Sequence, residues 1–482
     1  MEGIEKVKYL LGRIYGKKDA ERAFEKIVSV IDRYAARKRK KEAFFSQEDV
    51  VLITYGDSLK KAGEAPLTTL HAFAGRYLKN AVSCIHFLPF FPYSSDDGFS
   101  VMDFFEINPE LGTWQEVESI GRDFELMFDY VVNHFSSKSR WFQNYLQGKD
   151  GFKEFAIDVD PSTDLSMVTR PRSLPLLTEY KKADSQTVHL WTTFSADQID
   201  FNFKSLDVLE KMIEVLLFYA ERGASILRLD AIAYLWKEIG TSCIHLPQTH
   251  DMVKLFRAVL DLVAPDVIIL TETNVPHDEN ISYFGDGRDE AQMVYNFTLP
   301  PLLFYSLVKE DAGKLTEWAA GLHLESEHNT FFNFTASHDG IGVRPLEGIL
   351  DPVELDCIFD TVKAIVGQVY YKNNPEGSES PYELIFSFPY LNLIKTRKRQ
   401  SAFHPNAGFE ILQIDPKVFG VRRYSQDQTI YALTNISSKP VSISLSETAS
   451  TDRTTDLITG EKVKPAALHL NPYQYMWLAE TD

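Results

Sequence analysis

Residues 223–240 read Gly-Ala-Ser-Ile-Leu-Arg-Leu-Asp-Ala-Ile-Ala-Tyr-Leu-Trp-Lys-Glu-Ile-Gly. The apolar pair Ile226-Leu227 is typical of a buried parallel strand. Arg228 and Asp230 follow two positions apart, so the alternation of a strand points both side chains to the same side. A charged pair on an apolar strand is unfavourable unless it has partners or a purpose. A buried ion pair that fixes the register would explain the pair alone, but similar carboxylates end other predicted strands.

The same pattern of an apolar strand followed by a polar residue recurs along the chain. Amphipathic helical stretches, such as 206–222 and 250–263, separate these strands, and repeated strand–helix units imply an α/β protein with a parallel sheet. Seven or more units favour a closed (β/α)₈ barrel of the TIM type, whose active site lies at the carboxyl ends of the strands. The predicted strands are 51–55, 83–90, 125–132, 226–230, 267–272, 293–297 and 331–336.

The barrel pattern covers residues 48–406, with further segments around and inside it. Residues 1–47 carry the apolar spacing of helices, which predicts an N-terminal helical extension. The long segment 135–200 is rich in Ser, Thr, Asp and Pro, and it predicts an inserted loop subdomain. Residues 407–482 alternate in short apolar and polar runs, which predicts a C-terminal antiparallel β domain.

The composition narrows the classes of function. The 482 residues carry a formal net charge of −18, which argues against nucleic acid or an anionic membrane as a partner. The three cysteines are scattered, with neither metal-ligand spacing nor a disulfide pattern, and no phosphate-binding glycine loop is found. We therefore expect no metal and no cofactor. A signal-peptide pattern and a membrane-length apolar run are also missing, so a cytoplasmic protein is expected, of undetermined oligomeric state.

Acidic residues and histidines gather at the ends of the predicted strands. They are Asp129, Asp230, Glu272 and Asp339, with His134 and His338 beside two of them. Helix N-caps could account for Asp129 or Asp339 individually, but not for the whole set. On a barrel all of these side chains converge on one mouth. Two carboxyls facing each other across a sugar suit glycoside chemistry, and a retaining enzyme holds them about 5–5.5 Å apart.

These residues resemble the four signatures of glycoside hydrolase family thirteen, the α-amylase superfamily. The signatures are Asp129-Tyr-Val-Val-Asn-His134, Arg228-Leu-Asp230, Glu272 and His338-Asp339. The segments 88–99, 170–172, 191–194 and 237–243 resemble the sucrose-phosphorylase-like branch of that family. Within this branch, the N-terminal helices are similar to those of glucosylglycerate phosphorylases, as are segments 195–200, 271–277, 283–287 and 378–383.

The resemblance implies a retaining α-glucoside phosphorylase that converts 2-O-α-glucosylglycerate and inorganic phosphate into α-glucose 1-phosphate and glycerate. Asp230 would be the nucleophile that forms a β-glucosyl-enzyme, Glu272 the acid/base and Asp339 the carboxylate that stabilises the transition state. Arg228 is expected to keep Asp230 ionised. The remaining implied sugar contacts are Asp96, His134 and His338 to glucose hydroxyls, and Phe99 and Tyr234 against the ring.

Glycerate and phosphate are both anions, and arginine can meet either with two parallel hydrogen bonds. The candidates are Arg170, Arg172 and Arg344. The resemblance favours Arg172 for phosphate, and Arg344 is assigned to the glycerate carboxylate. Tyr382 and Glu383 are expected to line the same subsite, with Glu383 toward an acceptor hydroxyl. The alternative is that these arginines pair on the surface with the abundant acids.

One departure concerns the eighth barrel strand. The family carries an apolar eighth strand and then a Gly-Arg-x-Ile-Asn-Arg segment whose first arginine binds glucose, and neither is found here. Residues 384–388 are the candidate for an improvised strand, and Arg397 is expected at the surface of the helix that follows. Two alternatives stay open: phosphorolysis of sucrose or sucrose 6′-phosphate, and a non-catalytic sugar binder. Against sucrose stands Asn274, where sucrose phosphorylases usually have histidine.

Overall fold

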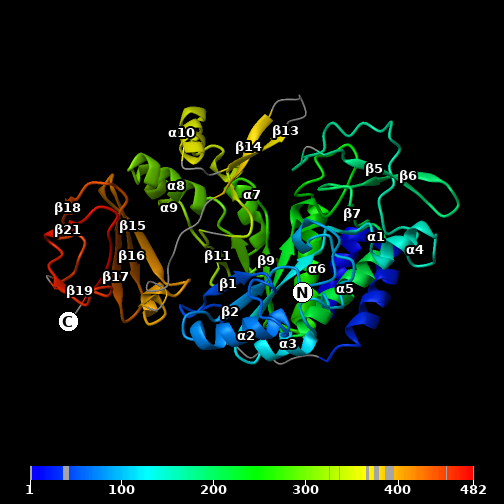
Figure 1. Cartoon of the computed structure of the whole chain (residues 1–482), viewed down its shortest axis with the longest axis horizontal. Coiled ribbons are helices and arrows are strands. Elements are labelled where there is room, and N and C mark those ends of the chain that lie inside the picture. Colours follow the sequence, from blue (N-terminus) through cyan, green and yellow to red (C-terminus); the bar gives the residue numbers. More distant parts are fainter. Residues whose placement is uncertain are drawn as a thin grey trace.

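A parallel sheet lies at the centre of the molecule (Figure 1). The computed structural model describes residues 3–35, 43–172, 174–324, 326–335, 337–364, 368–373, 379–385, 394, 396–451 and 453–480, with backbone only for 364, 368–373 and 379–385. Among these residues the sheet has seven strands, and every neighbouring pair is parallel. Their order is β1 (Val51–Thr54), β2 (Cys84–Phe87), β3 (Glu125–Val131), β8 (Ala224–Asp230), β9 (Ile268–Thr271), β10 (Met293–Tyr295) and β11 (Thr330–Phe332).

The register of the central strands brings the predicted acidic residues together. Asp129 of β3 pairs with Arg228 of β8, two positions before Val131 pairs with Asp230. The amide of Glu272, just after β9, donates to the carbonyl of Leu229 at 3.1 Å. Because parallel strands end on the same edge of the sheet, these side chains share one mouth. The predicted strands and the TIM-type α/β class are therefore confirmed.

Helices cover the outside of this sheet, and their buried faces make most of the core. α6 starts at Pro247, whose fixed φ suits a first helical position. α3 starts with a capping box between Thr113 and Glu116. The helices after the first are α2 (Pro66–Tyr77), α3 (Trp114–Ile120), α4 (Arg140–Leu146), α5 (Leu206–Glu221), α6 (Pro247–Val263), α7 (His277–Ile281), α8 (Leu299–Lys309), α9 (Gly313–Ala320) and α10 (Pro352–Ala364).

The N-terminal helix α1 (Ile4–Ile31) packs on α5 and α6, at the edge of the molecule opposite the C-terminal domain (Figure 1). It is kinked at Gly16, where φ is 70°. Lys26 on this helix forms ion pairs with Asp207 at 2.9 Å and with Glu210 at 2.5 Å. The predicted helical extension is thus a helix that packs on the outer side of two barrel helices.

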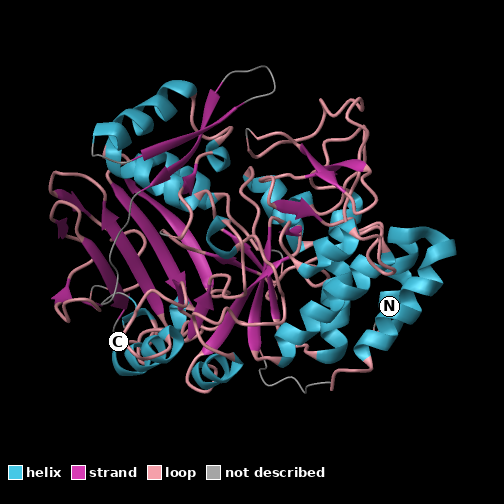
Figure 2. Cartoon of the chain, turned by 45° about the vertical axis from the view of Figure 1, so that its right-hand side comes forward, coloured by secondary structure: helices cyan, strands magenta, loops and turns pink. Residues whose placement is uncertain are grey.

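Small antiparallel units lie between β3 and β8. β4 (His134–Ser136) pairs with β7 (Gln198–Asp200), and β5 (Leu177–Lys181) forms a hairpin with β6 (Thr187–Trp191). The C-terminal residues form an antiparallel sheet at the opposite side of the molecule (Figure 2). Its strands are β15 (Gly408–Asp415), β16 (Val418–Tyr424), β17 (Thr429–Asn435), β22 (Tyr475–Glu480), β19 (Thr454–Asp456) and β20 (Lys462–Val463), beside the pair β18 (Val441–Ile443) and β21 (Leu468–Leu470).

No eighth parallel strand joins β11 to β1 within the described ranges. Residues 384–385, the start of the candidate for an improvised strand, do not join the parallel sheet. They belong to β14 (Glu379–Ile385), which pairs antiparallel with β12 (Ile341–Gly342) and β13 (Gln368–Asn373). Residues 386–388 of that candidate lie outside the described residues. A cavity of about 780 Å³ opens between the β1 and β11 edges and the C-terminal sheet, lined by side chains such as Ile53, Phe331 and Trp477.

Arg397 is a second correction to the sequence expectations. Its side chain is half-buried rather than at the surface, and its Nη1 donates to the carbonyl of Asp49 at 2.9 Å. Asp49 precedes β1, so this contact lies at the end of the sheet opposite the acidic mouth. Arg397 therefore does not replace the sugar-binding arginine. Separately, no described helix combines the length and the apolar character needed to cross a membrane.

Candidate active site

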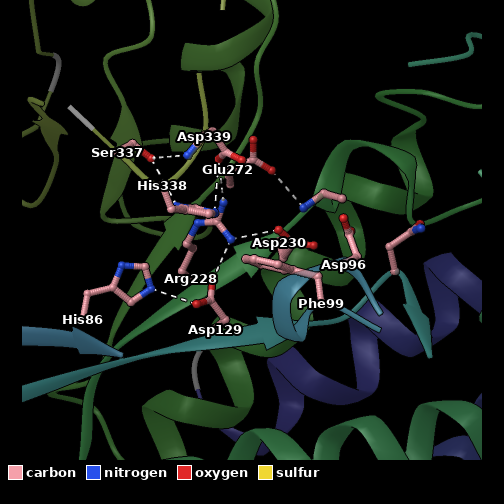
Figure 3. A network of polar contacts seen from close by, with 12 residues as sticks. His86, Asp96, Phe99, Asp129, Arg228, Asp230, Glu272, Ser337, His338 and Asp339 are labelled. Carbon is pink, nitrogen blue, oxygen red and sulfur yellow. Dashed lines mark hydrogen bonds and ion pairs between the residues drawn. The ribbon is translucent and has the colours of Figure 1, made fainter. Parts of the chain in front are cut away.

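Arg228 lies at the centre of the acidic mouth (Figure 3). Its side chain is 2% exposed, and its Nη1 donates to Asp129 Oδ1 at 2.6 Å and to Asp230 Oδ1 at 2.8 Å. Its Nη2 lies 4.0 Å from Asp339 Oδ2. The guanidinium also faces the Phe99 ring at 5.6 Å. One buried cation therefore holds three carboxylates from different loops and strands.

His86 was missed by the sequence analysis. Its Nε2 lies 2.9 Å from Asp129 Oδ2, and both side chains are fully buried. Burial alone would raise the pKa of Asp129, but the charges of His86 and Arg228 outweigh it and lower that pKa to about 2. Asp129 is thus a fixed negative charge beneath the site. The only signal in the sequence was a single histidine inside an apolar strand.

Asp230 and Glu272 are the carboxyls that the sequence analysis expects to be the nucleophile and the acid/base. Asp230 is 8% exposed at the end of β8, and Glu272 Oε2 accepts a hydrogen bond from the amide of Ala231 at 3.1 Å. Burial raises the pKa of both groups, and neighbouring carboxylates raise them further against the opposing charge of Arg228. Such a pair holds one proton between its members. Of the two carboxyls, Asp230 has the direct ion pair with Arg228, at 2.8 Å, which favours its ionised form.

Asp339 is the exposed member of the acidic set, with 45% of its side chain accessible. Its Oδ2 lies 3.3 Å from His338 Nε2, and its amide donates to Ser337 Oγ at 3.3 Å. The His338 ring stacks on Phe99, with centroids 5.4 Å apart and planes 11° apart. These contacts make a wall that joins the loop after β11 to the loop after β2, next to Arg228 (Figure 3).

Asp96 and His134 meet through a residue that the sequence analysis did not assign. Gln198 Nε2 donates to Asp96 Oδ2 at 2.8 Å and lies 3.1 Å from His134 Nε2. His134 Nε2 also lies 3.1 Å from the Phe99 carbonyl, and burial lowers the pKa of this histidine. The neutral His134 ring is therefore held by protein partners, whereas the Asp96 carboxylate is exposed at the mouth.

A buried ion pair supports His134 from behind. Lys237 Nζ lies 2.5 Å from Asp200 Oδ2 and donates to Asn133 Oδ1 at 2.7 Å. Asn133 Nδ2 in turn lies 3.3 Å from His134 Nδ1. Because Asp200 also accepts from the amide and hydroxyl of Thr193, its charge is fully surrounded by donors. This network fixes the orientation of the histidine.

The pKa of the Tyr234 hydroxyl is affected by the charges of two predicted anion-binding arginines. It belongs to the short helix η2 (Ile232–Tyr234) that follows Asp230. Burial raises the pKa of Tyr234 to about 12, and the charges of Arg344 and Arg172 oppose that rise, while Glu272 adds to it. The charges of both arginines and of the candidate acid/base thus affect the pKa of the same hydroxyl, that of Tyr234.

The other predicted anion-subsite residues are placed differently. Arg170 donates through Nη2 to the carbonyl of Leu174 within its own loop. Arg344 Nε lies 3.4 Å from Glu347 Oε1, in the short helix η4 (Arg344–Leu346). Tyr382 and Glu383 belong to β14, and their side chains lie outside the described residues.

The barrel-type sheet and its ring of carboxylates around a buried arginine define a protein class. The model for the catalytic domain of α-amylase matches residues 76–340, and that for the C-terminal domain of maltogenic amylase matches residues 409–477. The chain belongs to the α-amylase family, glycoside hydrolase family thirteen. Within it, the chain is 47% identical over 397 residues to the glucosylglycerate phosphorylase of Escherichia coli (strain K12), covering 82% of this chain and 70% of the relative.

Further relatives agree with that placement. The glucosylglycerate phosphorylase of Spirochaeta thermophila is 49% identical over 401 residues, covering 82% of this chain and 68% of the relative. The sucrose phosphorylase of Streptococcus mutans is 29% identical over 319 residues, covering 63% of each chain. The crystal structure of sucrose 6F-phosphate phosphorylase from Thermoanaerobacter thermosaccharolyticum superposes with a TM-score of 0.72 at 21% identity, covering 87% of this chain and 98% of the other. The last similarity shows a shared fold.

Proposed function

We propose that this chain is a retaining α-glucoside phosphorylase that acts on 2-O-α-glucosylglycerate and inorganic phosphate. The observation that carries the proposal is the mouth itself, where Arg228 holds Asp230 beside Glu272 and Asp339. The substrate is supported by the glucosylglycerate phosphorylases to which the chain is 47%, 49% and 50% identical. The proposal includes the roles that these residues have in each half-reaction.

In the first half-reaction, the Asp230 carboxylate attacks C1 of glucose. The bond from C1 to the glycerate oxygen breaks, and Glu272 gives its proton to that oxygen. The result is a β-glucosyl ester of Asp230 and free glycerate. Asp339, which is exposed to the mouth, is placed to hold sugar hydroxyls while positive charge develops at C1.

In the second half-reaction, a phosphate oxygen attacks C1 and the ester bond to Asp230 breaks. Glu272, now ionised, takes the proton of the attacking phosphate. Two inversions at C1 retain the α configuration, and α-glucose 1-phosphate leaves. Arg172 and Arg344, whose charges reach Tyr234, would bind phosphate and the glycerate carboxylate in turn.

The direct test is an incubation of purified protein with 2-O-α-glucosylglycerate and phosphate, with enzymatic detection of glucose 1-phosphate. We expect product from the unmodified chain and a loss of at least about 10⁴-fold in Asp230→Asn, because the nucleophile is gone. The variant should stay folded, since Arg228 keeps its 2.6 Å bond to Asp129. Product from sucrose or sucrose 6′-phosphate, with none from glucosylglycerate, would replace the proposed substrate.

A non-catalytic sugar binder is the second candidate. The observation in its favour is the open sheet between β11 and β1 in the described part of the chain, where the family places a sugar-binding arginine. Against it stands the complete set of Asp230, Glu272 and Asp339. Calorimetry separates the two functions, because a binder would show affinity for glucose or glucosylglycerate without any turnover.

A further inference from the structure

The loop 94–100 presents two of the proposed glucose contacts in a strained backbone conformation. Asp96 has a φ of 55° and Asp97 a φ of 46°, in the left-handed region that non-glycine residues rarely adopt. Gly98 has a φ of 111°, and a Cβ there would lie 2.7 Å from the carbonyl oxygen of Pro89. Asp96 and Phe99 therefore reach the mouth only while something holds this loop in place.

Asp197 is the residue that contacts both ends of this loop. Its Oδ2 accepts hydrogen bonds from the hydroxyls of Ser94, of Ser95 at 2.5 Å and of Ser100 at 2.9 Å. The first two serines precede the left-handed residues and the third follows them. One carboxylate oxygen thus ties the beginning of the loop to its end.

Asp197 is also anchored to Ser137, which lies outside the loop, although its carbonyl accepts from the Ser100 hydroxyl at 3.1 Å as well. Its Oδ1 accepts from the hydroxyl of Ser137 at 2.5 Å, and its carbonyl accepts from the Ser137 amide at 2.9 Å. Burial by itself would raise the pKa of Asp197, but the serine hydrogen bonds outweigh it and lower that pKa. The carboxylate is therefore ionised, and it has the acceptor capacity that several hydroxyl donors require.

The neighbouring residue completes the link to the sugar site. Gln198 follows Asp197 directly and donates to the Asp96 carboxylate at 2.8 Å. A shift of Asp197 would therefore move both ends of the loop, and it would also move Gln198, the hydrogen-bond partner of Asp96. None of the Asp197 atoms needs to touch the sugar for this to affect binding.

We propose that Asp197 is a positioning residue of the glucose subsite, whose carboxylate clamps the serines at both ends of the loop 94–100 and so sets Asp96 and Phe99 against the sugar. The identity of the sugar rests on the proposed function. The clamp itself rests only on the contacts within this chain.

The first test uses Asp197→Asn, which keeps the shape of the side chain but leaves one oxygen for several serine donors. Glucose affinity is measured by calorimetry, and KM and kcat are measured with 2-O-α-glucosylglycerate. We expect glucose binding to weaken and KM to rise by about tenfold or more, with a smaller change in kcat, because the loop contacts hold the sugar in the ground state as well. Ser95→Ala, a milder change, should shift both quantities in the same direction.

The matched control is Asp184→Asn, which removes an exposed carboxylate from the β5–β6 turn, where Asp184 accepts a hydrogen bond from the Gln186 amide. Its glucose affinity and KM should equal those of the unmodified chain. A fall in melting temperature of Asp197→Asn with unchanged glucose affinity and KM would show a structural role only and overturn the proposal.

Amide hydrogen exchange on the free protein gives a readout that needs no turnover. The amides of Ser94, Phe99 and Ser100 are hydrogen-bonded within the loop. They should exchange faster in Asp197→Asn, while the amides of β8 keep their rates. Unchanged exchange in the loop would contradict the clamp even if activity fell. Faster exchange in a chain without any phosphorylase activity would support the clamp and contradict only the proposed function.

Discussion

At the scale of single residues, the two central carboxyls differ in their contacts. Asp230 has a direct ion pair with Arg228 at 2.8 Å, whereas Glu272 accepts a hydrogen bond from the Ala231 amide. A direct ion pair favours the ionised form of a carboxyl, and burial favours its protonated form. This difference supports the proposed roles of Asp230 as nucleophile and Glu272 as acid.

Replacing Glu272 by Gln should affect substrates according to their leaving groups. We expect a loss of about 10²–10⁴-fold with 2-O-α-glucosylglycerate, because glycerate needs a proton to leave, and a much smaller loss in the first half-reaction with α-glucosyl fluoride. Pre-steady-state measurement of fluoride release checks this. Equal losses for both donors would contradict the acid role.

The pH dependence of the same step follows from the raised pKa of Glu272. The first half-reaction needs this group protonated, so kcat/KM should fall as the pH rises through its folded pKa. The raised pKa extends the active range upward from the ordinary value of 4.5. In Glu272→Gln, assayed with α-glucosyl fluoride, this alkaline limb should disappear, and its persistence would point to another group.

Arg344→Ala should discriminate between charged and neutral acceptors. Losing one charge-assisted contact to a carboxylate costs about 1.5–3 kcal/mol, which is about ten- to a hundredfold in affinity. We therefore expect glucosylglycerate to lose far more than glucosylglycerol, as measured by KM for each. Arg172→Ala should mainly raise the KM for phosphate. Identical small losses for both glucosides would show that Arg344 only pairs with Glu347 on the surface.

The positions of Arg228, Asp230 and Glu272 could be predicted because each follows a local strand pattern. His86 could not, since a histidine inside an apolar strand is as often a core residue as a functional one. The clamp of Asp197 could not be predicted either. It joins serines about a hundred positions away, and no local periodicity reports contacts of that range.

At the scale of elements, α1 contributes to stability through its buried face. Leu11 is 0% exposed against the barrel helices, whereas Tyr9 on the same helix is 50% exposed. Leu11→Ala should lower the free energy of unfolding by about 2–5 kcal/mol, because it leaves a cavity. Tyr9→Ala, the matched control, should change it by about 0.5 kcal/mol or less. Denaturant melts measure both, and equal effects would mean that α1 is not docked.

The strand β14 shows what an apolar pattern leaves open. Residues 384–388 were the candidate for an improvised barrel strand, and the described part of it, 384–385, does lie in a strand, but an antiparallel one beside β12 and β13. The sequence reports that a segment is extended and half apolar. It does not report which neighbour satisfies the backbone, because parallel and antiparallel partners demand similar side chains.

At the scale of the whole molecule, the buried charge of Asp129 links stability to pH. Its pKa falls from the ordinary 3.8 to about 2 on folding. A lowered pKa stabilises the folded state above the unfolded value, and this stability is lost as the pH falls through the folded value. The contribution is about 2 kcal/mol. In Asp129→Asn, the free energy of unfolding should depend less steeply on pH between these two values, and parallel curves would contradict it.

The contacts at the open edge of the sheet also set the order in which this chain can fold. Each parallel strand pairs with the next one along the chain, so the wall from β1 to β11 can assemble progressively as a ribosome releases it. The bonds from Arg397 to Asp49 and from His404 to Phe45 span 348 and 359 positions. They can form only after more than four-fifths of the chain has been synthesised. Until then the apolar edges of β1 and β11 are exposed to solvent. Because exposed apolar edges favour aggregation, nascent chains should depend on chaperones during that interval.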